Sequence, residues 1–285
     1  MSIRVAVIYS GEPRSYDRVV NQHLQFLEGL EYHTYHSTWT KSTAEDREKI
    51  GIAPNPMHAS LVDYECTERP DILQFEKKLL EAKKNHPIFM LGRIQYMTAM
   101  SYEPVNYSGR KYDYVVRLRY DFEYEGKLID YLPLVKTEKD IVVTRKMGGK
   151  SSPINIWDGF ALGRQDIMTW YFHFHRWIPF SLSHEGVASW KFQPEYVYGS
   201  YLRYIGANVV ESDLQPNHVY WNDMDVSDHR TTRTVQYYRD LATQHPEFYT
   251  QRNGKLTIEN DSPVVSDKYI IYELKKEGFN CNEIQ

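Results

Sequence analysis

The stretch from residue 112 to residue 124 constrains the fold of this chain more than any other. It reads Tyr-Asp-Tyr-Val-Val-Arg-Leu-Arg-Tyr-Asp-Phe-Glu-Tyr. Successive side chains of a strand point to opposite sides, so one face is apolar and collects Tyr114, Val116, Leu118, Tyr120 and Phe122. The other face collects Arg117, Arg119, Asp121 and Glu123. Two guanidinium groups followed by two carboxylates suit a metal-bound diphosphate better than they suit a protein core.

The composition excludes several classes of protein. The chain has 285 residues, of which 41% are hydrophobic and 25% charged, as in soluble globular proteins. A formal net charge of −4 gives no overall basic character that would attract nucleic acid or acidic membranes. Cys66 and Cys281 are too few for a disulfide scaffold. The first apolar run is too short for a signal peptide and no run could span a membrane. We therefore expect a cytoplasmic protein, in the host cytoplasm if the source is a virus.

The order of the elements predicts an α/β fold with a Rossmann-like, mostly parallel central sheet flanked by helices. Residues 3–9 predict a buried strand, residues 16–30 a helix and residues 31–36 a second strand, whereas residues 40–70 are expected to be irregular. Later strands are expected at 112–119, 140–145, 155–162 and 207–213, and helices at 71–84, 89–102, 164–176, 194–205, 234–244 and 267–277. We expect one domain over residues 1–215 and a helical C-terminal extension, residues 216–285, packed on it.

The loop after the first strand is a candidate phosphate contact, with Ser10, Gly11, Glu12 and Arg14 as its candidate residues. In a parallel sheet this loop and Asp121 lie at the same edge, where ligands of open α/β sheets bind. Gly11 permits close approach of the backbone, and Arg14 offers a bidentate fork to a phosphate. A single glycine is too few for a Walker loop or a dinucleotide fingerprint, and a plain β-to-α turn is the alternative.

Asp121 and Glu123 are candidate metal ligands. They are one residue apart, so in extended backbone both carboxylates project the same way and could share a hard cation. Mg²⁺ and Mn²⁺ prefer oxygen ligands and often bridge to substrate phosphates. Such an ion would neutralise the charge of a departing nucleoside diphosphate, with Arg117 and Arg119 beside it. The alternative is a solvated ladder of salt bridges on an edge strand.

Four segments resemble GT-A-type glycosyltransferases, especially those of viruses and bacteria. They are residues 4–17, 112–123, 157–163 and 194–202. The resemblance extends over residues 3–215 and implies a nucleotide-sugar donor, with a UDP-sugar expected, in a Rossmann-like half. It also implies Mn²⁺ or Mg²⁺ on a D-x-D-type acidic pair. Here the second acid is Glu123, which keeps an oxygen ligand but has a longer reach.

Two carboxylates are candidate catalytic residues. Asp158, between Trp157 and Gly159, could contact a sugar hydroxyl or act as general base, or it could be a turn aspartate. Glu195 lies at a predicted helix start, where the helix dipole stabilises a carboxylate even without a catalytic role. The resemblance implies that an acid at such a helix start is the base of an inverting enzyme. Neither the stereochemistry nor the choice between the two acids follows from the sequence.

Two further residues are candidate ligand contacts. The resemblance implies that a late histidine, here His218, supplies a third metal ligand or a diphosphate contact. Four neighbouring residues compete with it for this role: Asp223, Asp225, Asp228 and His229. Arg93 lies near the start of the helix predicted at 89–102 and could contact the donor or lie on the surface.

The leading hypothesis is therefore a metal-dependent glycosyltransferase that acts on a hydroxyl acceptor, which could be a glycan or another molecule. A modified base in phage DNA is a minority option that would use Lys146, Lys150, Arg230 and Arg233. A sugar-phosphate nucleotidylyltransferase and a non-enzymatic module that binds glycan or nucleic acid through its aromatic residues remain as alternatives. The sugar, the acceptor and the oligomeric state do not follow from the sequence.

Overall fold

The computed structural model describes residues 2–13, 15–74, 76, 91–144, 159–181, 194–214, 216–218, 249–252 and 255–258. The chain divides into two compact units, residues 1–79 with 88–219 and residues 80–87 with 220–285. Across the described residues, no helix has both the length and the apolar character that a bilayer crossing requires.

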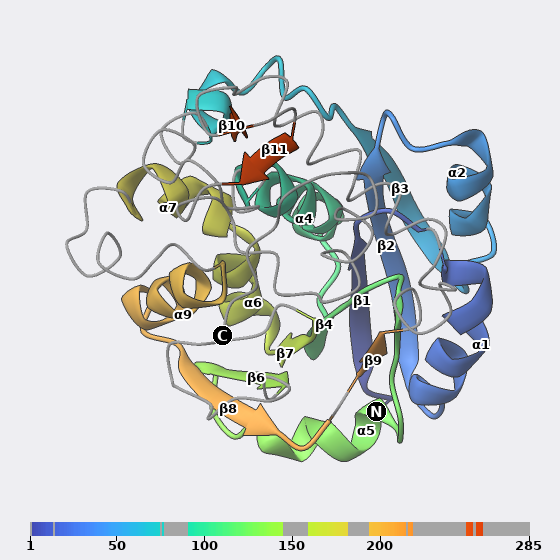
Figure 1. Ribbon diagram of the computed structural model, residues 1–285. Helices are drawn as coiled ribbons and strands as arrows, with labels where there is room; N and C mark the ends of the chain where they lie inside the picture. Colours follow the sequence, from blue (N-terminus) through green and yellow to red (C-terminus); the bar gives the residue numbers. More distant parts are fainter. Residues whose placement is uncertain are drawn as a thin grey trace. The chain divides into compact units, whose positions relative to one another are not determined.

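The first unit is built on a seven-stranded sheet with the order β3-β2-β1-β4-β7-β6-β8 (Figure 1). Its strands are β1 (Arg4–Ser10), β2 (Glu31–Trp39), β3 (Pro56–Val62), β4 (Tyr114–Leu118), β6 (Asp140–Thr144), β7 (Ala161–Gly163) and β8 (Asn208–Ser212). β7 runs antiparallel to both of its neighbours, and the other paired strands of this sheet are parallel. The predicted α/β class with a mostly parallel sheet is confirmed.

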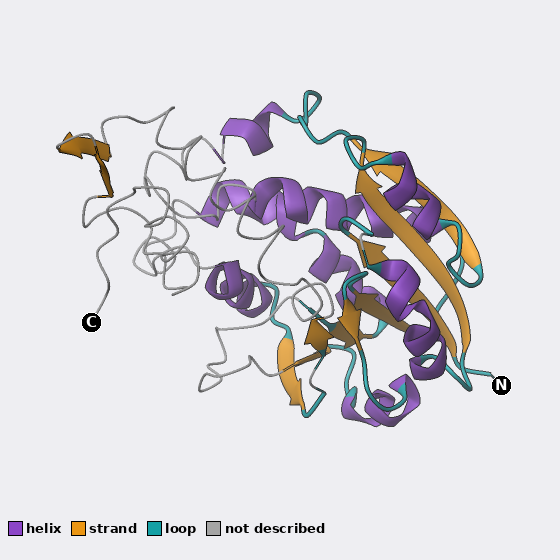
Figure 2. Cartoon of the chain, turned by 45° about the vertical axis from the view of Figure 1, so that its right-hand side comes forward, coloured by secondary structure: helices purple, strands orange, loops and turns teal. Residues whose placement is uncertain are grey.

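Helices cover both faces of this sheet (Figures 1 and 2). They are α1 (Tyr16–Phe26), α2 (Ala44–Ile50), α4 (Leu91–Tyr107), α5 (Leu128–Tyr131), the 3-10 helix η2 (Leu132–Leu134), α6 (Gln165–Phe172), α7 (Phe174–Ser181) and α9 (Pro194–Tyr204). On one face Val19 and Phe26 of α1 join a core with Val7 and Val116. On the other face α4, α6, α7 and α9 pack over a second core that includes Val115. A strand buried on both sides, as β4 is, therefore carries apolar residues on both faces.

The stretch 112–124 is divided between two strands. After β4 the chain turns at Tyr120 and Asp121 and then forms β5 (Phe122–Glu123), which pairs antiparallel with β9 (Asn217–His218). The predicted apolar face is confirmed, because Val116, Leu118, Tyr120 and Phe122 all lie in the core beneath α1. The prediction for the opposite face is wrong at Arg117. This side chain is not open to a ligand but only 2% exposed, beneath the helices of the other layer.

The prediction that residues 40–70 are irregular is wrong. They contain α2 and the strand β3, which lies at one end of the sheet. Most residues of β3 are exposed, so the strand lacks the alternation of buried and exposed positions by which a strand is recognised.

Of the second unit, the structure describes an antiparallel hairpin formed by β10 (Tyr249–Arg252) and β11 (Lys255–Ile258). The helices predicted at 234–244 and 267–277 lie outside the described residues. The helical character of the extension and the domain boundary after residue 215 stay predictions.

Candidate functional site

The candidate site lies where β1 and β4 end side by side. The two strands pair in parallel, with Tyr9 opposite Leu118. From β1 the chain adds β2 and β3 on one side, and it then returns to place β4 on the other side. Such a switch in strand order opens a crevice at the carboxyl ends of the two strands, where α/β proteins bind ligands. The loops after Ser10 and after Leu118 share this edge, as the sequence predicts for parallel strands.

The loop after β1 rests on the turn after β4. Gly11 has a φ of +130°, a conformation that side chains other than glycine rarely adopt. Its N–H donates to the carbonyl oxygen of Ser37 at 3.2 Å, and a Cβ placed on Gly11 would lie 3.9 Å from the Tyr120 ring. The Ser10 and Thr98 hydroxyl oxygens are 3.0 Å apart, which ties the end of β1 to α4. The backbone of this loop is therefore held in a fixed position beside the acidic turn.

Arg119 and Asp121 form a bidentate ion pair within that turn. The Arg119 Nε donates to Asp121 Oδ1 at 2.9 Å, and Nη2 donates to Oδ2 at 2.8 Å. Both side chains are partly exposed, and the Arg119 guanidinium also lies 4.8 Å from the centre of the Phe122 ring. This fork geometry is the one by which arginine recognises either a carboxylate or a phosphate.

Arg117 places a second guanidinium group beneath the same edge. It projects from β4 toward α6, where its Nη1 donates to the Tyr171 hydroxyl at 3.3 Å. The group is charged at any physiological pH, and its burial makes it a fixed source of positive potential near the carboxyl end of β4.

A buried histidine supports the turn from below. His23 of α1 lies 2.6 Å from the Phe122 carbonyl oxygen through Nε2, and its Nδ1 lies 3.0 Å from the Tyr9 hydroxyl. Because a carbonyl only accepts, Nε2 carries the proton and Nδ1 accepts the hydrogen bond from Tyr9. Burial lowers the pKa of His23 to about 4, against opposing effects of the Phe122 carbonyl and of Asp121. His23 is therefore neutral at pH 7 and acts as a hydrogen-bonded brace.

Two tyrosines complete this support. The Tyr124 hydroxyl accepts the Arg119 backbone N–H at 2.9 Å and donates to the Gly159 carbonyl oxygen at 2.8 Å. The Tyr120 hydroxyl lies 3.1 Å from Nδ1 of His36, a buried histidine whose pKa is lowered by burial to about 3. The supporting role of these residues is not evident from the sequence. The available signal was the position of His23 between Val20 and Phe26 on the buried face of α1, although such a pattern also fits an ordinary core.

The described side chains do not form a metal site. Among them, no three His, Cys, Asp or Glu residues lie close enough together to hold an ion. Asp121 already accepts two hydrogen bonds from Arg119, and Glu123 lies on β5. The pairing of β5 with β9 sets the His218 backbone opposite Phe122, but the His218 side chain lies outside the described part. The metal set of Asp121, Glu123 and His218 stays a prediction.

The remaining predicted residues are not brought together by the described structure. Arg93 pairs with the buried Glu76, with 2.8 Å between Arg93 Nε and Glu76 Oε2. Glu12 is half-buried in the loop after β1. Arg14, Asp158 and the side chain of Glu195 lie outside the described residues, although Glu195 occupies the second position of α9.

Comparison with known proteins assigns no family. No family model matches the chain, and no curated protein matches its sequence. The solved structures that it resembles include the apo form of mouse xyloside xylosyltransferase 1. That match has 10% sequence identity and a TM-score of 0.41, and it covers 80% of this chain and 91% of the mouse chain.

Proposed function

We propose that this chain is a glycosyltransferase that binds the diphosphate of a nucleotide sugar at the edge shared by β1 and β4. The observation that carries the proposal is the guanidinium fork of Arg119, which is held at this switch point beside the loop of Gly11. The sequence resemblance to GT-A-type glycosyltransferases at residues 4–17 and 112–123 supports the same conclusion.

Arg119 provides the main contact to the donor in this proposal. A diphosphate offers Arg119 the same pair of oxygen acceptors that Asp121 offers in the described structure, so the fork can exchange one for the other. Arg117 adds positive potential from below, and the backbone at Gly11 allows a phosphate to approach closely. These groups would stabilise the negative charge that develops on the leaving nucleoside diphosphate.

The acceptor side of the reaction is proposed from the sequence alone. Asp158 or Glu195 would act as general base on a hydroxyl of a glycan or another acceptor. A Mn²⁺ or Mg²⁺ ion on Asp121, Glu123 and His218 belongs to the same proposal, and we assign no step of the transfer to it. Measuring donor affinity with Mn²⁺ and with EDTA decides whether binding needs the ion.

Donor hydrolysis provides the first test of the proposal. We would incubate the purified chain with UDP-, GDP- and TDP-sugars and Mn²⁺ and measure the released nucleoside diphosphate, since many transferases slowly hydrolyse their donor. At least one donor should be hydrolysed and should raise the melting temperature, because a ligand that binds the folded state stabilises it. If no nucleotide sugar does either, the proposal is wrong. Release of pyrophosphate from a nucleoside triphosphate would instead indicate nucleotidyl transfer.

A further inference from the structure

The edge strand β3 is unusually open for the end of a sheet. Its sequence, Pro-Met-His-Ala-Ser-Leu-Val, contains no lysine, arginine or acidic residue, and Leu61 is 52% exposed. Proteins usually protect such edges with charges, prolines or bulges, because an unpaired strand recruits another strand. Here the protection is confined to the start of the strand, where Pro56 and a register shift occur. Among the residues that the structure describes, none pairs with the outer side of β3 beyond this point.

The backbone groups that face outward can be identified from the pairing of β3 with β2. The Val62 carbonyl oxygen accepts the Thr40 N–H at 2.9 Å, so Val62 turns its backbone groups inward. The backbone N–H and C=O groups of successive residues in a strand point alternately to its two sides. Those of Ala59 and Leu61 therefore point outward, away from β2. Within the described part of the chain, β2 is the strand that pairs with β3, at its inner side.

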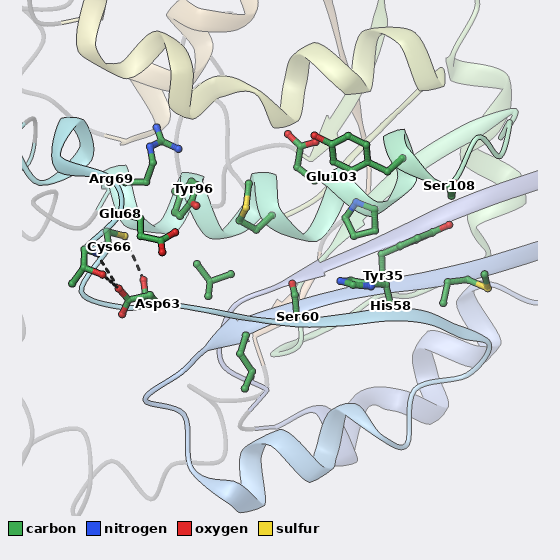
Figure 3. A pocket seen from close by; sticks show the side chains of 17 residues that line it. Tyr35, His58, Ser60, Asp63, Cys66, Glu68, Arg69, Tyr96, Glu103 and Ser108 are labelled. Carbon is green, nitrogen blue, oxygen red and sulfur yellow. Dashed lines mark hydrogen bonds between the residues drawn. The ribbon is translucent and has the colours of Figure 1, made fainter.

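A groove of about 810 Å³ runs between β3 and α4 (Figure 3). Its volume lies in the range of known binding pockets. Tyr35 of β2 is paired with His58 of β3, so their side chains lie on the same face of the sheet. Because Tyr35 belongs to the same core as Tyr102 of α4, His58 and Ser60 are on the face toward α4 and line this groove. Val62, Met100 and Pro104 add apolar surface to the lining.

The rim of the groove is acidic, with the carboxylates of Asp63, Glu68 and Glu103. The Asp63 carboxylate accepts hydrogen bonds from the Thr67 backbone N–H at 3.0 Å and from the Thr67 hydroxyl at 2.8 Å, and these bonds lower its pKa. The Arg69 guanidinium on the same rim is balanced by Asp71, with 2.7 Å between its Nη2 and an Asp71 oxygen. His173 lies 3.3 Å and the Arg176 guanidinium 3.9 Å from Glu103, so that carboxylate is already paired, whereas Glu68 is exposed.

We propose that an extended, basic polypeptide segment binds here as an additional strand on the outer edge of β3. Backbone hydrogen bonds to Ala59 and Leu61 would give the affinity, as in other complexes formed by strand addition. Every second side chain of the bound segment would lie on the groove side, where lysines or arginines meet Glu68 and Asp63. The intervening side chains would lie on the face of Leu61 and should be apolar. This site is independent of sugar transfer and stands whether or not the proposed function is correct.

The test uses the full chain and a labelled seven-residue peptide that alternates lysine and valine, followed by fluorescence anisotropy. We expect saturable binding that weakens with salt. The same peptide with glutamate in place of lysine, and a peptide N-methylated at alternate residues to block pairing, should each bind about tenfold more weakly or worse. Equal binding of the glutamate or the N-methylated peptide, or no binding of the lysine peptide, would overturn the proposal.

Variants of the chain locate the site. Ala59→Pro removes an N–H that points outward from the edge strand, a substitution that edge strands tolerate. It should weaken peptide binding about tenfold. The matched control Ala59→Thr keeps this N–H and should not weaken binding. Glu68→Lys should weaken it by a similar factor, and Glu68→Gln by less. Unchanged binding by a folded Ala59→Pro variant would refute strand addition. Sedimentation as a dimer that Ala59→Pro dissociates would also refute the proposal, because a second copy of the chain would then occupy this edge.

Discussion

Arg119 has two alternative partners of the same shape, the carboxylate of Asp121 and, under the proposed function, a phosphate. The ion pair with Asp121 prevents the guanidinium from collapsing elsewhere, so its orientation is set before the ligand arrives. A preorganised donor loses little conformational entropy on binding, and this gain offsets part of the cost of breaking the pair with Asp121.

Substitution of Arg119 should therefore weaken donor binding more than loss of charge alone explains. Arg119→Lys keeps the charge but loses the fork, and we expect the Kd for the nucleotide sugar to rise about tenfold; Arg119→Gln should raise it further. Isothermal titration calorimetry measures both. Arg176→Gln, which removes a guanidinium that is 68% exposed on α7, is the matched control and should bind as the unmodified chain does. Unchanged affinity of Arg119→Gln would remove Arg119 from the site.

Single residues also show how far the sequence could predict the site. The alternation of β4 correctly predicts which residues face α1, since that depends only on strand geometry. The burial of Arg117 could not be predicted, because it depends on Tyr171 in a helix more than fifty residues later. The role of His23 was equally hidden, since the Phe122 carbonyl that it binds belongs to β5, which lies 99 residues later in the chain.

The loop between β1 and α1 is the element whose shape depends most on one residue. A side chain at Gly11 would have to adopt a φ of +130°, although it would meet no steric clash with Tyr120. We expect Gly11→Ala to reduce the free energy of unfolding by about 1–3 kcal/mol and also to weaken donor binding.

Gly109→Ala is the matched control for this substitution. Gly109 has a φ of +66° at a position where an added Cβ meets no atom within 4 Å, and it lies beyond the far end of α4. It should also lose stability, by about 1–2 kcal/mol, but should bind the donor normally. Urea unfolding and donor titration of both variants separate the two effects, and equal donor affinity in both would contradict the proposed role of the loop.

The short strand β7 should tolerate substitution poorly. A Cβ on Gly163 would lie 2.9 Å from the Asp140 carbonyl oxygen and 3.1 Å from side-chain atoms of Ile167 and Met168. We expect Gly163→Ala to reduce the free energy of unfolding by about 1–3 kcal/mol through this overpacking. Urea titration measures the change, and an unaltered midpoint would show that the backbone at β7 adjusts freely.

Elements whose apolar residues repeat regularly were predictable from the sequence, whereas α5 and η2 were not, although Leu128 and Leu132 are buried. β1, α1, β2 and β4 lie close to their expected positions because their apolar residues follow the period of the element. β3 was not predictable, for the opposite reason. An exposed edge strand is stabilised by its backbone pairing with β2, which leaves no hydrophobic pattern to read.

At the scale of the whole molecule, stability should depend on pH through three histidines that are buried in the described part of the chain. Burial lowers the pKa of His23 to about 4 and those of His36 and His175 to about 3, compared with an ordinary value of 6.5. Below pH 6.5 the unfolded chain binds more protons than the folded chain. The free energy of unfolding should therefore be maintained above about pH 6.5 and fall as the pH drops toward 4, by up to about 1.4 kcal/mol per pH unit for each histidine.

Urea unfolding between pH 4 and pH 8 measures this dependence. His23→Gln cannot titrate and should show a shallower loss below pH 6.5 than the unmodified chain, even if its stability at pH 7 is lower. A free energy of unfolding that is constant from pH 7 to pH 4.5 would show that these histidines are not buried as described.

The place of β7 in the sheet has a consequence for biosynthesis. β7 separates β4 from β6 in the sheet, yet it is translated after both of them. While the ribosome makes the residues between Thr144 and Ala161, the apolar segment Ile141–Val143 has no neighbouring strand to join. A nascent chain stalled in this interval would expose an aggregation-prone strand, so slow codons placed here should increase its demand for chaperones.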